Sequence, residues 1–112
     1  MNEEMLDWHL PLKNKKFSQA SYAKELKKFI EDERDTASFV VGWLAQGKTE
    51  EALQKVHAVK LLATDLGAKA LSSASFSLEM ALKAGADTSV CLNHFESVFV
   101  DTLLAMSVYL SK

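Results

Sequence analysis

Apolar residues recur every three or four positions between the few glycines of this chain, and strand-like alternation is almost absent. The glycines are Gly42, Gly47, Gly67 and Gly85, and Pro11 is the only proline. Spacings of three and four place apolar side chains on one face of an α-helix. The sequence therefore predicts an all-α protein whose helices are separated by short turns.

Four amphipathic helices are expected after a short helical lead-in. The lead-in covers residues 6–16, and the helices cover residues 18–47, 49–66, 69–84 and 87–110. The first should be one long helix, capped by Ser18 and bent at Gly42 or near the acidic run around Glu33. Four helices with short connections most simply form an antiparallel up-down four-helix bundle, here as a single domain over residues 1–112.

Composition limits the expected partners and location. The formal net charge is -2, so no whole-molecule field attracts nucleic acid, and the lysine-rich run from Lys13 to Lys28 is interleaved with and followed by acidic residues. Cys91 is the only cysteine, the longest nearly apolar run is too short to cross a bilayer, and the acidic N-terminus lacks a signal-peptide layout. We therefore expect a cytoplasmic domain without nucleic-acid or membrane contact.

His57 is the candidate reactive residue. The apolar stripe of its helix consists of Ala52, Val56, Val59, Ala63 and Leu66. His57 lies roughly 140° from the centre of that stripe, so its ring should face solvent. Lys60 follows one turn later, Leu53 and Leu61 flank the histidine as apolar neighbours, and Gln54 and Thr64 add no negative charge.

This pattern suits a phosphoryl carrier. A neutral imidazole nitrogen is a competent nucleophile for phosphorus, and Lys60 is placed to neutralise an anion on the ring. The helix has no partner base, no phosphate-binding glycine loop and no carboxylate cluster for magnesium. A partner would therefore supply the metal and the electrostatic stabilisation. An incidental surface histidine is the alternative interpretation.

The segment "HAVKLLATDLGAKAL" resembles the signature of histidine-containing phosphotransfer (HPt) domains, His-x-x-Lys-Gly followed by Gly-Ala. His57, Lys60, Gly67 and Ala68 match it in order and spacing. "LAQGKTEEALQKV" and "LSSASFSLEMALKAG" resemble the flanking family segments, and "LDWHLPL" resembles the start of such modules at the C-terminus of tripartite hybrid sensor kinases. The resemblance covers nearly the whole chain.

The resemblance implies a phosphorelay function. His57 would accept a phosphoryl group from the aspartate of a response-regulator receiver domain and pass it to another, and Lys60 would stabilise its charge. Leu53, Gln54, Leu61 and Thr64 would form the docking surface. The domain would need no cofactor of its own, because the receiver supplies Mg²⁺. We expect the domain to act as a monomer, either free-standing or within a hybrid sensor kinase.

Leu61 departs from the family pattern, which has glycine after the lysine. The leucine either becomes part of the docking contact, or it crowds the ring. In the second case the chain would be a degenerate HPt-like module that binds a receiver or kinase without transferring phosphate.

Other candidate sites are weaker. His9, His94 and Cys91 lack the spacing of a helical metal site, so no metal site is expected. Phe76 and Met80 are expected to cover the edge of the bundle near Trp8.

Overall fold

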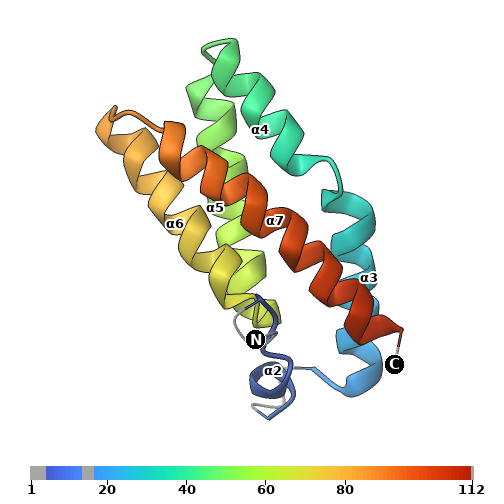
Figure 1. Cartoon of the computed structure of the whole chain (residues 1–112). Coiled ribbons are helices and arrows are strands. Elements are labelled where there is room, and N and C mark those ends of the chain that lie inside the picture. The colour runs from blue at the N-terminus through green and yellow to red at the C-terminus, as the bar shows by residue number, and fades with distance from the viewer. Residues whose placement is uncertain (1–4, 14–16, 112) are drawn as a thin grey trace.

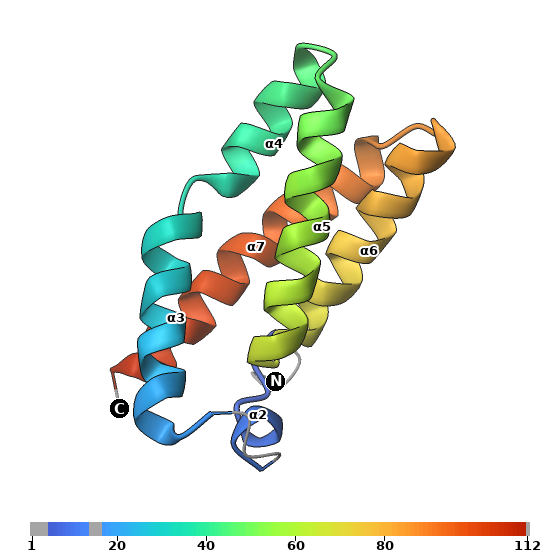
Figure 2. The ribbon, with the colours of Figure 1, turned by 180° about the vertical axis from the view of Figure 1, so that it is seen from behind.

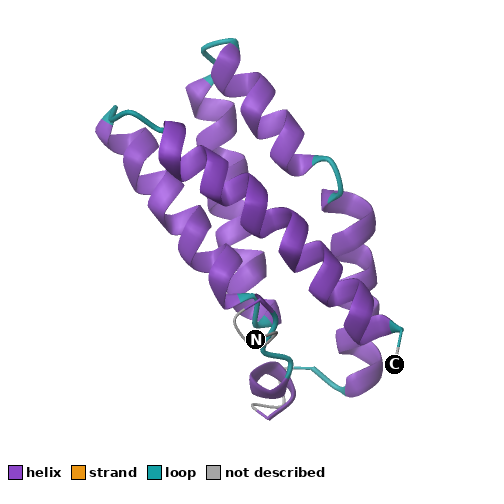
Figure 3. Cartoon of the chain, in the orientation of Figure 1, coloured by secondary structure: helices purple, strands orange, loops and turns teal. Residues whose placement is uncertain are grey.

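The protein is all-helical, as Figure 3 shows for the computed structural model, which describes residues 5–13 and 17–111. Its helices are α2 (His9–Lys13), α3 (Gln19–Glu33), α4 (Thr36–Ala45), α5 (Thr49–Leu66), α6 (Lys69–Ala84) and α7 (Ser89–Leu110). No strand occurs in these two ranges, so the all-α prediction is confirmed. The acidic N-terminal residues 1–4 and the end of the predicted lead-in, residues 14–16, lie outside the described part.

The predicted long helix over residues 18–47 is wrong in one respect. The chain breaks at Arg34 and Asp35 into α3 and α4, whereas α4 continues through Gly42. An unbroken helix would hold the acidic run in its middle. The break instead places Asp35 at the N-terminus of α4, where the helix dipole favours negative charge. Thr36 Oγ1 closes the corner by donating a 2.7 Å hydrogen bond to Glu33 Oε1.

The helix starts and ends follow local chemistry. Ser18 caps α3 by accepting from the backbone N–H of Ser21, and the rings of Phe17 and Tyr22 pack 5.9 Å apart, as the staple spacing predicts. Gly67 ends α5 with a φ of 83°, a left-handed conformation that suits glycine. The short turn that follows sends α6 back along α5.

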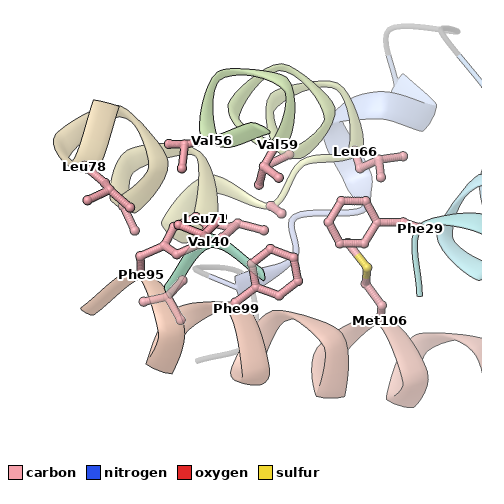
Figure 4. Close-up of a cluster of buried hydrophobic side chains, with 14 of the residues drawn as sticks. Phe29, Val40, Val56, Val59, Leu66, Leu71, Leu78, Phe95, Phe99 and Met106 are labelled. Carbon is pink, nitrogen blue, oxygen red and sulfur yellow. The ribbon is translucent and has the colours of Figure 1, made fainter. Parts of the chain in front are cut away.

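The long helices pack along one another around a common apolar core. α5 contacts α4 and α6, while α7 crosses the opposite side and contacts α3, α4 and α6 (Figures 1 and 2). Figure 4 shows core side chains from α3 to α7 meeting at the centre. They include Phe29, Val40, Val56, Val59, Leu66, Leu71, Leu78, Phe95, Phe99 and Met106. None of the described helices has the length and apolarity required to span a bilayer.

The lead-in closes the end of the molecule where α5 meets α6 (Figure 1). Asp7 donates its backbone N–H to the carbonyl of Gly67 at 2.7 Å, and its carboxylate pairs with Lys69 at 2.9 Å. Leu6 is buried in the core beside this contact. The Asp7 carbonyl lies so close to Gly67 that a Cβ there would overlap it.

We expect Gly67→Ala to destabilise the fold by about 3 kcal/mol, because the methyl group meets the Asp7 backbone and the left-handed conformation becomes strained. Gly85→Ala is the matched control: Gly85 has a φ of 66° but open space around it, so strain alone should cost about 1 kcal/mol. Urea unfolding followed by circular dichroism measures both values. Equal losses of stability would show that the added methyl group is not hindered by the Asp7 backbone.

Candidate functional site

His57 lies on the exposed side of α5, as the helical wheel predicts. The five residues of the predicted apolar stripe are the five buried residues of the helix. The His57 side chain is 50% exposed, so Leu61, one turn further along, does not bury the ring. The imidazole is therefore open to a partner from the solvent side.

The ring of His57 has a partner that sequence reasoning missed. Glu79 of α6 is buried, with its side chain only 3% exposed, and its Oε2 lies 2.7 Å from His57 Nδ1. The two residues are 22 positions apart in the sequence. Sequence reasoning considered only the helix of His57, whereas the partner carboxylate comes from the neighbouring helix.

A second contact between α5 and α6 fixes the same alignment. Thr64 Oγ1 and Ser72 Oγ lie 2.7 Å apart. Thr64 lies seven residues after His57 on α5, and its partner Ser72 lies seven residues before Glu79 on α6. Antiparallel helices in one register produce this relation. The position of Glu79 against His57 is thus a property of helix pairing, which the sequence pattern of a single helix does not reveal.

Two lysines complete the environment of the carboxylate. Lys60 Nζ lies 2.8 Å from Glu79 Oε1, and Lys83 Nζ lies 3.3 Å from Oε2. Lys60 also lies over the ring of Phe76, 5.5 Å from its centroid. Lys60 was predicted to neutralise an anion near His57, and its resting partner in the structure is Glu79.

The charge state of Glu79 determines the tautomer of His57. Burial alone would raise the pKa of Glu79, but hydrogen bonds from Lys60, His57 and Lys83 outweigh it and lower the pKa from 4.5 to about 2. An ionised carboxylate can only accept hydrogen bonds. Nδ1 of His57 must therefore carry the proton, and in the neutral ring the lone pair available for reaction is on Nε2.

Exposed apolar side chains lie near the site on both helices. Leu61 is 53% exposed, Phe76 is 52% exposed and Met80 is 49% exposed. The prediction that Phe76 and Met80 cover the bundle edge near Trp8 is wrong, since Trp8 instead packs against His9 and Tyr109. Phe76 and Met80 flank Glu79 on α6, so they border the histidine site.

The structure brings most of the predicted docking residues to this surface. Gln54, Leu61 and Thr64 are exposed on α5 beside His57, whereas Leu53 is half-buried and packs against the core. We call the surface formed by Gln54, His57, Leu61, Thr64, Phe76 and Met80 the His57 face. It combines apolar side chains with the ammonium groups of Lys60 and Lys83, and the carboxylate of Glu79 is buried beneath it.

The other candidate ligands stay apart. His9 stacks on Trp8, His94 is exposed on α7, and Cys91 is half-buried. Across residues 5–13 and 17–111, no three His, Cys, Asp or Glu side chains converge as a metal site would require.

Comparisons of the chain with protein-family models, curated proteins and solved structures give no significant match.

We expect the Glu79 interactions to make stability depend on acidity. Because the folded pKa is lowered from 4.5 to about 2, the stabilisation is present above pH 4.5 and is lost as the pH falls towards 2. The lowered pKa corresponds to about 3 kcal/mol. Urea unfolding at pH 6, 4, 3 and 2 should show this loss in the wild type and a smaller loss in Glu79→Gln. Identical pH profiles would contradict the role of the carboxylate.

Proposed function

We propose that this chain is a histidine phosphotransfer domain that relays a phosphoryl group between receiver-domain aspartates through His57. The observation that carries the proposal is an exposed imidazole whose Nδ1 is held by a buried, ionised carboxylate. This arrangement leaves Nε2 as the nucleophile. The domain would contribute the nucleophile and a docking surface, and it would not catalyse transfer alone.

The proposed reaction is an in-line displacement at phosphorus. The lone pair of His57 Nε2 attacks the phosphorus of a receiver's aspartyl phosphate, and the bond between phosphorus and the aspartate oxygen breaks. The electron pair of that bond leaves with the aspartate as a carboxylate. Transfer to the next receiver reverses these steps, so the carrier returns unchanged. The receiver supplies Mg²⁺ and the acidic cluster that holds it.

The two lysines suit a group that gains negative charge. Lys60 and Lys83 both end within hydrogen-bonding reach of the carboxylate that holds His57. Their flexible side chains can move from Glu79 to a phosphoryl group on the same ring. Such a movement would stabilise phosphohistidine without placing uncompensated positive charge at the resting site.

The proposed architecture is an antiparallel four-helix bundle in which α3 and α4 together form one broken helix. We place the domain in the cytoplasm as a monomer that binds receiver domains, either free-standing or as a module of a hybrid sensor kinase. The second candidate function is a degenerate HPt-like module that binds a receiver or kinase without phosphotransfer. The feature that favours that alternative is the departure of Leu61 from the glycine of the HPt pattern.

We expect His57→Gln to abolish acid-labile, alkali-stable labelling by a phosphorylated receiver domain with Mg²⁺, because no other residue of the site can carry the group. His94→Gln is the control, since His94 is exposed on another helix. It should label as the wild type does. Label that persists in His57→Gln would refute the assignment of His57. If the wild type is not labelled by any of a broad panel of phosphorylated receivers, the result would favour the interaction module.

Leu61→Gly distinguishes a docking role of the leucine from crowding. The imidazole is 50% exposed beside Leu61, so we expect the leucine to act in docking. The variant should bind the receiver about tenfold more weakly, a loss of about 1.4 kcal/mol, because an apolar side chain leaves the interface. Leu62→Gly, with the same helix penalty one residue away, is the control. Titration calorimetry measures binding and rapid quench measures transfer; faster transfer in Leu61→Gly would indicate crowding instead.

A further inference from the structure

We propose that Glu79 keeps a proton on Nδ1 of His57 while the ring carries a phosphoryl group, so that the ring always leaves phosphorus as a neutral imidazole. This inference rests on the proposed function for its biological setting. It assigns Glu79 as a positioning residue that controls how phosphoryl release depends on pH.

The geometry places an anion where the proton must stay. Glu79 Oε2 lies 2.7 Å from Nδ1, and the carboxylate is buried between α5 and α6. A buried carboxylate held by several donors has little freedom to move away when the ring reacts. The opposite nitrogen, Nε2, is the one left for phosphorus. One ring therefore has a fixed proton acceptor on one nitrogen and the reacting bond on the other.

The proton matters for the leaving group. After Nε2 bonds to phosphorus, the ring with a proton on Nδ1 is an imidazolium, and an imidazolium ordinarily loses its proton near pH 6.5. If the proton is lost, cleavage of the bond between Nε2 and phosphorus must expel an imidazolate anion, which is a poor leaving group. If the proton stays, the electron pair of that bond returns to Nε2 and neutral imidazole is released.

The charges around the ring favour retention of the proton. The groups that face the ring or its carboxylate are Glu79 from α6, Lys83 from the same helix, and Lys60 from α5. A phosphoryl group brings about two negative charges. Those charges offset the two ammonium groups, and the carboxylate of Glu79 then remains as net negative charge beside an imidazolium.

Chemical phosphorylation tests the inference without a receiver. Potassium phosphoramidate phosphorylates accessible histidines, and ¹⁵N and ³¹P NMR report whether Nδ1 of each phosphohistidine is protonated. His94 is an internal reference, because its ring is exposed on a different helix, α7. His9 is exposed as well, so the variants His9→Gln, His57→Gln and His94→Gln assign the resonances. At pH 8 we expect phosphorylated His57 to retain its Nδ1 proton, and the signal of phosphorylated His94 serves as the comparison.

The same samples give a quantitative comparison. The titration midpoint of phosphorylated His57 should fall by about one pH unit in Glu79→Gln, which keeps an acceptor oxygen but loses the charge. As the pH rises, the rate of phosphohistidine hydrolysis should begin to fall at a pH about one unit lower in Glu79→Gln than in the wild type. Lys83→Ala, at an exposed side chain, should move the midpoint in the opposite direction because a cation is removed.

Three outcomes would overturn the inference: a deprotonated Nδ1 on wild-type phosphorylated His57 at pH 8, an unchanged midpoint in Glu79→Gln, or a lower midpoint in Lys83→Ala. Neither the wild-type reading nor the Lys83→Ala reading depends on the folding of Glu79→Gln. Failure of transfer from receivers would reject the proposed function but would leave these NMR readings intact.

Discussion

The buried carboxylate of Glu79 connects the packing of α5 and α6 to the chemistry of the histidine. A charge at this depth is costly unless it is paired, and here it forms ion pairs with Lys60 and Lys83 and a hydrogen bond with His57. Because Lys60 and His57 come from α5, the pairing is satisfied only when the two helices lie in one register. The interaction that orients the imidazole therefore also favours the helix alignment that creates the site.

Periodicity and capping chemistry predicted much of the fold. The bounds of α5 and α6, the buried side of α5 and the exposure of His57 follow from residues within each helix. The break at Arg34 and Asp35 was harder to predict from the sequence, because it depends on where the acidic run lies relative to the end of α3 and the start of α4. The sequence suggested a bend near Glu33 without showing that the helix would stop.

The site could be predicted only in part. His57, Lys60 and Leu61 were identified because they lie within one turn of each other on a single helix. Glu79 was missed because its role arises from the pairing of α5 with α6, and a glutamate next to apolar residues reads as an ordinary helix position. The sequence did contain a signal for Glu79. Its spacing from Ala74 and Leu78 places it on the buried side of α6, where an acidic side chain without a partner would be unfavourable.

The contact between the lead-in and Gly67 has a mechanical consequence. The chain ahead of α2 is fastened at Leu6 and Asp7 to the turn that joins α5 to α6, the two helices that hold His57 and Glu79. The same segment also contacts α7, through Met5 against Thr102 and through the rings of Trp8 and Tyr109. The lead-in therefore links α7 to the turn between the two helices that hold the imidazole and its carboxylate, and its loss would free that end of both.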